Sequence, residues 1–151
     1  MSVTVTVGNG YQPNYDLDLD FGREGEESIA AILRDVFDDG DRIEVKRDRR
    51  AAETKNLYVE VLQQRSGTVG YKKSGISIST ADYWFFIYGE QDDGTFGFLG
   101  VPTGLLYEAA KKRYEETRRF VDGGADGDCP TKGILLRIAD VALLATTAPR
   151  P

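Results

Sequence analysis

The alternation of apolar and polar residues in several short segments is the strongest constraint on the fold. Residues 42–48 place apolar side chains on one face and charged side chains on the other, and residues 57–63 alternate in the same way. A period of two is typical of β-strands, because successive side chains point to opposite faces. Residues 3–7 and the apolar run at 83–88 predict two further strands. The chain is therefore expected to build a sheet of short strands.

Two segments with helical spacing flank these strands. Apolar residues recur at intervals of three or four in residues 24–37 and again in residues 104–121. Residues 91–94 predict a hairpin turn, the Gly- and Asp-rich residues 122–133 a loop, and residues 134–145 a final strand followed by a turn of helix. The order of helix, strand meander, helix and strand predicts helices packed on a mixed sheet, in an α/β or α+β fold.

The length of 151 residues predicts one domain with one core, with an N-terminal extension at 1–20 and a flexible tail at 146–151. No apolar run is long enough to span a bilayer, and the N-terminus lacks the layout of a signal peptide. The single cysteine, Cys129, cannot form an internal disulfide. These features favour a reducing, cytoplasmic setting.

Composition excludes several kinds of chemistry. The chain has no histidine and one cysteine, which removes Ser-His-Asp and Cys-His catalysis and the usual zinc sites. The net charge of −6 excludes a generic basic coat for nucleic acid, although a local basic face is compatible with an acidic total. Any hydrolytic chemistry must therefore depend on carboxylates, lysine, hydroxyls and hard cations such as Mg²⁺.

One group of charged residues could perform such chemistry. Alternation places Glu44, Lys46 and Asp48 on one face of their strand, and Glu60 lies within the next strand. If these strands are antiparallel neighbours, the side chains lie about 5 Å apart. Clustered carboxylates are natural Mg²⁺ ligands, and a lysine beside them can orient a water or stabilise charge on a phosphate. The alternative is a solvated strand face on which Glu and Lys pair across strands.

Several short blocks together resemble a family of small phage and prophage proteins. The blocks that carry the resemblance are residues 43–48, 54–60, 74–76 and 80–84, with 22–26 at the start of the first helix. That family is assigned to the PD-(D/E)xK nuclease superfamily, near its Holliday-junction-resolvase-like branch. The resemblance implies a restriction-endonuclease-like mixed central sheet flanked by two helices.

The resemblance also implies an activity, a DNA endonuclease that depends on Mg²⁺ or Mn²⁺ and acts on DNA, branched DNA included. Glu26, Asp48 and Glu60 would hold the metal, Lys46 would act on the attacking water or the phosphate, and Glu44 is a further ligand candidate. A homodimer is also implied. The sequence departs from the superfamily pattern, in which an aspartate on one strand precedes Glu-x-Lys on the next, because no lysine stands two residues after Glu60.

Other polar residues are candidates for nucleic-acid contact, namely Lys72, Lys73, Thr80, Lys112 and Arg119. The alternatives are a solvated helix face for the last two and an ordinary strand start for Thr80. The rival function is a catalytically inert nuclease-like fold that binds a protein partner or DNA, for example as an inhibitor or DNA mimic. An enzyme that acts on RNA or free nucleotides is a second rival.

Overall fold

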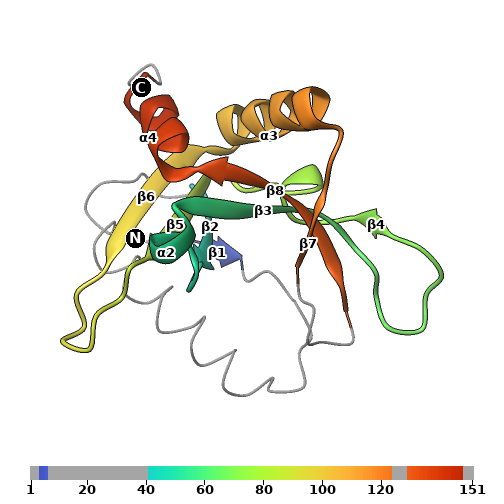
Figure 1. Cartoon of the computed structure of the whole chain (residues 1–151), viewed down its shortest axis with the longest axis horizontal. Coiled ribbons are helices and arrows are strands. Elements are labelled where there is room, and N and C mark those ends of the chain that lie inside the picture. The colour runs from blue at the N-terminus through green and yellow to red at the C-terminus, as the bar shows by residue number, and fades with distance from the viewer. Residues whose placement is uncertain (1–3, 7–40, 124–128, 148–151) are drawn as a thin grey trace.

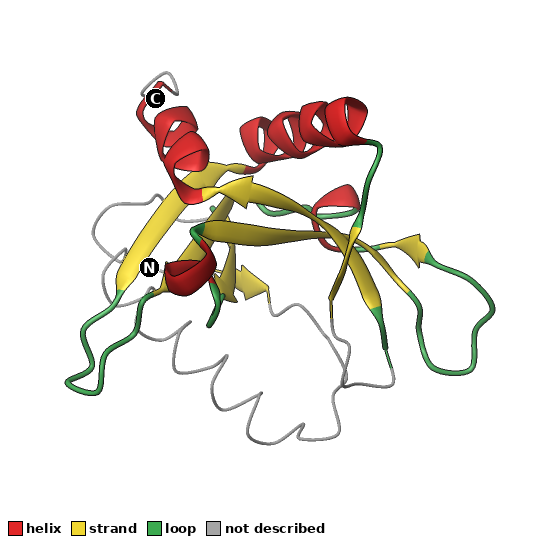
Figure 2. Ribbon diagram, in the orientation of Figure 1, coloured by secondary structure: helices red, strands yellow, loops and turns green. Residues whose placement is uncertain are grey.

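The computed structural model describes residues 4–6, 41–123 and 129–147. Within these residues the strands form two four-stranded sheets, and the fold class is α+β, as the sequence predicts (Figure 1 and Figure 2). Helices α3 (Thr103–Thr117) and α4 (Ile138–Thr147) lie together on one side of the molecule, where both contact the second sheet. The predicted first helix at 24–37 lies outside the described residues.

The first sheet is mixed and has the order β1-β2-β5-β6. Strand β2 (Arg42–Arg47) lies parallel to both β1 (Thr4–Thr6) and β5 (Tyr83–Tyr88). Strand β6 (Gly97–Pro102) follows β5 through the predicted hairpin turn and pairs with it antiparallel. The sheet thus places the charged face of β2 beside the most apolar strand of the chain.

The second sheet is antiparallel throughout, in the order β4-β3-β8-β7. Its two long strands are β3 (Asn56–Gln63) and β8 (Thr131–Arg137), and its edges are the short strands β4 (Lys72–Lys73) and β7 (Val121–Gly123). The register of β3 against β8 shifts between Glu60 and Leu62, which marks a β-bulge.

One prediction about pairing is wrong. The strands that carry Glu44 and Glu60 are not neighbours, because β2 belongs to the first sheet and β3 to the second. The connection between them contains a short helix, α2 (Ala51–Thr54), which ends with Lys55 in the left-handed conformation. This connection redirects the chain, so the described strands do not form the predicted single meander.

The predicted loop at 122–133 is also partly wrong, because β7 and the start of β8 lie within it. Its glycines fill a packing role. A Cβ at Gly123 or Gly133 would lie within 2.6 Å of the Tyr58 ring, so both residues make room for that side chain on the sheet. The glycines in this segment indicate a loop when only the sequence is considered, although two of them lie in strands and allow the Tyr58 ring to pack closely.

The main core lies between one face of each sheet and the two long helices. Its fully buried side chains include Trp84 and Phe86 of β5, Leu57 and Val59 of β3, and Leu106 of α3. A second apolar group covers the opposite face of the first sheet and consists of Ile43, Val45, Phe85 and Ile87. The first sheet is therefore apolar on both faces, and Glu44 lies on the face that looks into the main core.

Helix α3 ends four residues earlier than the sequence predicts. Arg118 adopts the left-handed conformation after Thr117, and Phe120 then folds back to stack on Tyr114 at 4.5 Å between ring centroids. Helix α4 is longer than predicted and continues through Thr147, two residues into the expected tail. No helix in the described part of the chain is long and apolar enough to cross a membrane.

Candidate functional site

Glu44 is a nearly buried carboxylate on the inner face of the first sheet. It is 7% exposed, and its partner across β2 and β5 is Trp84. Its Oε1 lies 2.8 Å from the Lys46 ammonium, and its Oε2 accepts a hydrogen bond of 3.3 Å from the Ser79 hydroxyl. A buried carboxylate is expensive unless it is paired and hydrogen-bonded, and Glu44 has both kinds of partner.

Lys46 lies two residues along the same strand and completes a Glu-x-Lys pair, Glu44-Val45-Lys46, on one face. Its side chain is 26% exposed, so the ammonium lies between the core and solvent. The same ammonium lies 5.3 Å from the centre of the Trp84 ring, within the range of a cation–π interaction. The Glu44 carboxylate and the Trp84 ring together hold the Lys46 ammonium between the core and solvent.

Ser79 connects Trp84 to Glu44. Its hydroxyl oxygen accepts hydrogen bonds from Trp84 Nε1 at 3.0 Å and from the Ala81 amide at 3.3 Å. A serine hydroxyl has two acceptor lone pairs and one hydrogen. Since two N–H donors use the lone pairs, the hydrogen is directed to Glu44 Oε2. We call Glu44, Lys46, Ser79 and Trp84 the buried polar cluster.

Asp48 lies just beyond the end of β2 and contacts backbone. Its Oδ1 accepts from the Arg50 amide at 3.1 Å, and its Oδ2 accepts from the Tyr58 amide at 3.0 Å. These two bonds fix the turn into α2 and the start of β3. The structure gives Asp48 a structural role at the crossing between the two sheets.

Glu60 lies on the opposite face of β3 from Leu57 and Val59, which pack in the main core. Its neighbour on that face is Tyr58, whose hydroxyl lies 2.8 Å from Thr131 Oγ1. Burial raises the pKa of the Tyr58 phenol to about 12. Among the described residues Glu60 makes no ion pair or side-chain hydrogen bond, so the structure does not bring it to the buried polar cluster.

The described residues fit a magnesium ion only in part. Magnesium takes one or two carboxylates and completes its shell with waters and substrate phosphates. Glu44 fits as one ligand, but no group of three or more Asp, Glu, His or Cys that could hold a metal occurs in the described segments. Glu26, the further ligand that the resemblance implies, lies outside them.

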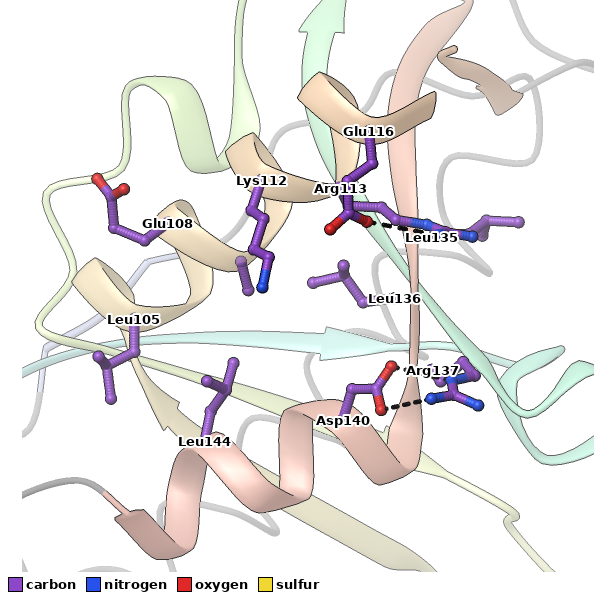
Figure 3. Close-up of a pocket in the computed structure, with 11 residues that line it drawn as sticks. Leu105, Glu108, Lys112, Arg113, Glu116, Leu135, Leu136, Arg137, Asp140 and Leu144 are labelled. Atoms are coloured by element: carbon purple, nitrogen blue, oxygen red, sulfur yellow. Dashed lines mark hydrogen bonds and ion pairs between the residues drawn. The ribbon is translucent and has the colours of Figure 1, made fainter. Parts of the chain in front are cut away.

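A pocket of 780 Å³ lies elsewhere, between α3, α4 and β8 (Figure 3). Leu105, Leu136 and Leu144 form its apolar floor, and Lys112 extends over that floor from α3. Arg137 and Asp140 close one end through a bidentate ion pair, which lowers the pKa of Asp140. Lys112 is the one predicted site residue among those that line this pocket. No member of the buried polar cluster lines it, so the pocket is separate from that cluster.

The remaining predicted contact residues are exposed. Lys72 and Lys73 form β4, Thr80 follows Ser79, and Arg119 follows the end of α3. The sequence prediction did not include Ser79 or Trp84 among the site residues. The sequence does contain an indication of this contact. A buried indole N–H needs a hydrogen-bond acceptor, and a serine stands five residues before the only tryptophan.

Comparison with protein-family models, curated proteins and solved structures found no match for this chain. The buried polar cluster and the surfaces around it are therefore the basis for inferring function.

Proposed function

We propose that this protein is a metal-dependent nuclease that hydrolyses DNA phosphodiester bonds, with the Glu44–Lys46 pair at its centre. The observation that carries the proposal is the pair itself, a 7%-exposed carboxylate bonded to a partly exposed ammonium on one strand. Both groups come from β2, so in this proposal Glu44-Val45-Lys46 serves as the Glu-x-Lys unit. This revises the sequence prediction, which took Glu60 as a metal ligand, found no lysine two residues after it, and gave the lysine role to Lys46.

Each residue of the buried polar cluster has a role in this proposal. Glu44 would hold the metal, and Ser79 keeps its carboxylate in one orientation. Lys46 offers positive charge to a phosphate oxygen or to the attacking water, and the Trp84 ring holds its ammonium in place. A bound Mg²⁺ would supply Lewis-acid stabilisation of the charge that develops on the phosphate. The proposal leaves out Asp48 and Glu60 as ligands.

The test combines metal binding with cleavage. Trp84 is the only tryptophan, so its fluorescence reports on the buried polar cluster. Titration with paramagnetic Mn²⁺ should quench this fluorescence, and EDTA should restore it. Cleavage is then measured on duplex, single-stranded and four-way-junction DNA and on RNA. Glu44→Gln should lose the quenching and at least about 100-fold of the cleavage rate.

Glu60→Gln is the matched control, since it makes the same chemical change on the other sheet. It should retain metal binding and cleavage within about threefold. Loss of activity in Glu60→Gln with retention in Glu44→Gln would return the centre to β3. A wild-type protein that binds no Mn²⁺ and cleaves no substrate would refute the nuclease proposal.

A second candidate function is a non-catalytic binding module. The observation that favours it is the pocket between α3, α4 and β8, which has an apolar floor and a charged rim of the kind that proteins use for partner segments. Tight association with a protein partner, undiminished by EDTA and weakened by Leu136→Asp or Leu144→Asp, would support this candidate.

A further inference from the structure

The segment between Glu60 and Asp82 differs in charge from the rest of the chain. Residues 61–81 contain Arg65, Lys72 and Lys73 and no acidic residue. The chain as a whole has 19 basic and 25 acidic residues, so this segment is a local basic region in an acidic protein. A locally basic segment can carry a positive potential that the net charge of a whole chain conceals.

The basic segment forms an arm that extends from the second sheet. Strands β3 and β4 pair at Leu62 with Lys73 and at Gln63 with Lys72, and the chain between them projects away from the core (Figure 1). A turn shapes the arm, because the amide and hydroxyl of Thr68 both donate to the Arg65 carbonyl, at 3.1 and 2.7 Å. The arm is thus a two-stranded stem with a defined tip.

The tip exposes an apolar side chain. Val69 is fully exposed, and Gly67 and Gly70 on either side of it have φ values of 75° and 79°. No atom of the described residues lies within 4 Å of a Cβ built at either glycine. The tip is therefore clear of the described part of the protein, and the Val69 side chain is exposed on it.

The stem carries cations and one aromatic ring. Arg65, Lys72 and Lys73 are exposed and make no ion pair with any described residue. Tyr71 is 37% exposed, and the Lys132 ammonium lies 4.9 Å from its ring centre, held there by Asp122 at 2.7 Å. Unpaired cations beside an aromatic ring on a narrow ribbon match the phosphates and bases of a nucleic acid.

We propose that this arm, residues 62–73, is a DNA-binding element that binds phosphates with its stem and places Val69 against a base step. A two-stranded ribbon fits a DNA groove, and exposed apolar side chains act as wedges at unstacked steps. The wedge predicts preference for branched or bulged DNA over an intact duplex. This inference rests on the proposed function for its choice of DNA as partner.

The chain connects the arm directly to the buried polar cluster. After Lys73 the amide of Ser74 donates to the Val61 carbonyl at 3.0 Å, and the 3₁₀ helix η1 (Gly75–Ser77) packs on β3. Ser79 follows and donates to Glu44. Five residues, 74–78, separate Lys73 from Ser79 along the chain, so the arm and the hydroxyl that donates to Glu44 belong to one connection.

The experiment measures binding without cleavage. Fluorescence anisotropy of labelled duplex and four-way-junction DNA is recorded with the full chain in EDTA, over a range of salt concentrations. Lys72→Ala/Lys73→Ala should weaken binding to both DNAs by about tenfold and lower the slope of log K against log salt by about 2. Val69→Ser should weaken binding to the junction about fivefold and leave duplex binding within about twofold.

Lys111→Ala is the control, because it removes an exposed lysine of α3 that the proposal does not place on DNA. It should leave binding unchanged. An arm variant that binds DNA like wild type, or a wild-type protein that binds no DNA at low salt, overturns the proposal. Binding of the wild type to RNA or anionic phosphatidylserine vesicles in preference to DNA also overturns it. Glu44→Gln should bind DNA normally, so failure of the arm and failure of the proposed active site give different results.

Discussion

Glu44 and Glu60 occupy similar positions in sequence and contrasting positions in space. Each interrupts an apolar alternation in the middle of a strand. Glu44 lies on the core face of the first sheet with an ammonium at 2.8 Å and a hydroxyl at 3.3 Å. Glu60 lies on the outer face of the second sheet, where the described residues offer its side chain no ion pair or hydrogen bond.

The difference shows that the side of the sheet matters more than the residue type. A carboxylate that faces a core must have partners, because its desolvation is otherwise unfavourable by several kcal/mol. A carboxylate on a half-exposed face can rely on water. Dedicated partners around a buried charge are therefore the stronger indication of a functional group, and the following predictions test this contrast.

The largest effect on stability is expected at Gly75, which packs against Glu60 and precedes Ser79, the hydrogen-bond partner of Glu44. Gly75 has a φ of 51°, and a Cβ placed on it would lie 2.3 Å from the carbonyl oxygen of Glu60. Gly75→Ala should lower the free energy of unfolding in urea by about 3 kcal/mol, from backbone strain and the displacement of η1. Because Ser79 follows η1, Trp84 fluorescence should also change.

Gly70→Ala separates backbone strain from steric displacement of η1, the two causes of the stability loss expected for Gly75→Ala. Gly70 has a φ of 79° but nothing within 4 Å of a built Cβ, so only backbone strain applies. The expected loss is about 1 kcal/mol. Equal losses at the two positions would mean that η1 can move freely, and that Ser79 is less firmly placed than its hydrogen bonds indicate.

Lys46→Met tests the need of the buried carboxylate for its cation. The substitution leaves Glu44 desolvated and without its ion pair, so we expect a loss of about 2 kcal/mol, reduced from the value for a fully buried pair because Lys46 is partly exposed. Lys132→Met removes a comparable pair whose acid, Asp122, is 76% exposed. Its loss should be clearly smaller, as measured by urea unfolding. A larger loss for Lys132→Met would contradict the contrast between the two sheets.

Ser79→Ala tests the hydroxyl that joins Trp84 to Glu44. It removes the acceptor of a buried indole N–H and a donor to a buried carboxylate, so we expect a loss of about 1.5 kcal/mol. Mn²⁺ quenching of Trp84 should require about tenfold more metal, because Glu44 is no longer held in one orientation. Ser79→Thr keeps the hydroxyl and should restore most of the metal affinity. Equal metal affinities for alanine and threonine variants would leave Ser79 with a purely structural role.

The sequence predicted the strands well and their partners poorly. Alternation located β2, β3 and β5 to within about a residue or two, since period two depends only on which side chains face the core. Pairing depends on how a connection turns. The Asp48 hydrogen bonds and the left-handed Lys55 send β3 into the other sheet, and residue pattern did not show this.

The candidate site was predictable in part for the same reason. Glu44 and Lys46 share a face by alternation alone, and the structure places them together. Glu60 joined them in the prediction because β2 and β3 were taken as neighbours and because the resemblance implied a metal ligand at this position. Ser79 lies in an irregular segment, where no period exists to indicate which way a side chain points, and its contact with Glu44 required the parallel pairing of β2 with β5.

The smallest expected effect on stability concerns Asp82, which bridges the starts of the parallel strands β2 and β5. Asp82 precedes β5, and its Oδ2 accepts from the Arg42 amide at 2.9 Å, which holds the pKa of this carboxyl below its ordinary value of 3.8. A lowered pKa means that Asp82 stabilises the fold above about pH 4, and that this contribution is lost as the pH falls through its folded-state pKa. Asp82→Asn should therefore reduce stability at pH 7 by about 0.5 kcal/mol, since the side chain is 42% exposed, and the difference from wild type should shrink in acid. Urea unfolding at pH 7 and pH 3 measures both values. A difference that grows in acid would mean that folding raises the pKa of Asp82, which would contradict a stabilising hydrogen bond from the Arg42 amide to the ionised carboxylate.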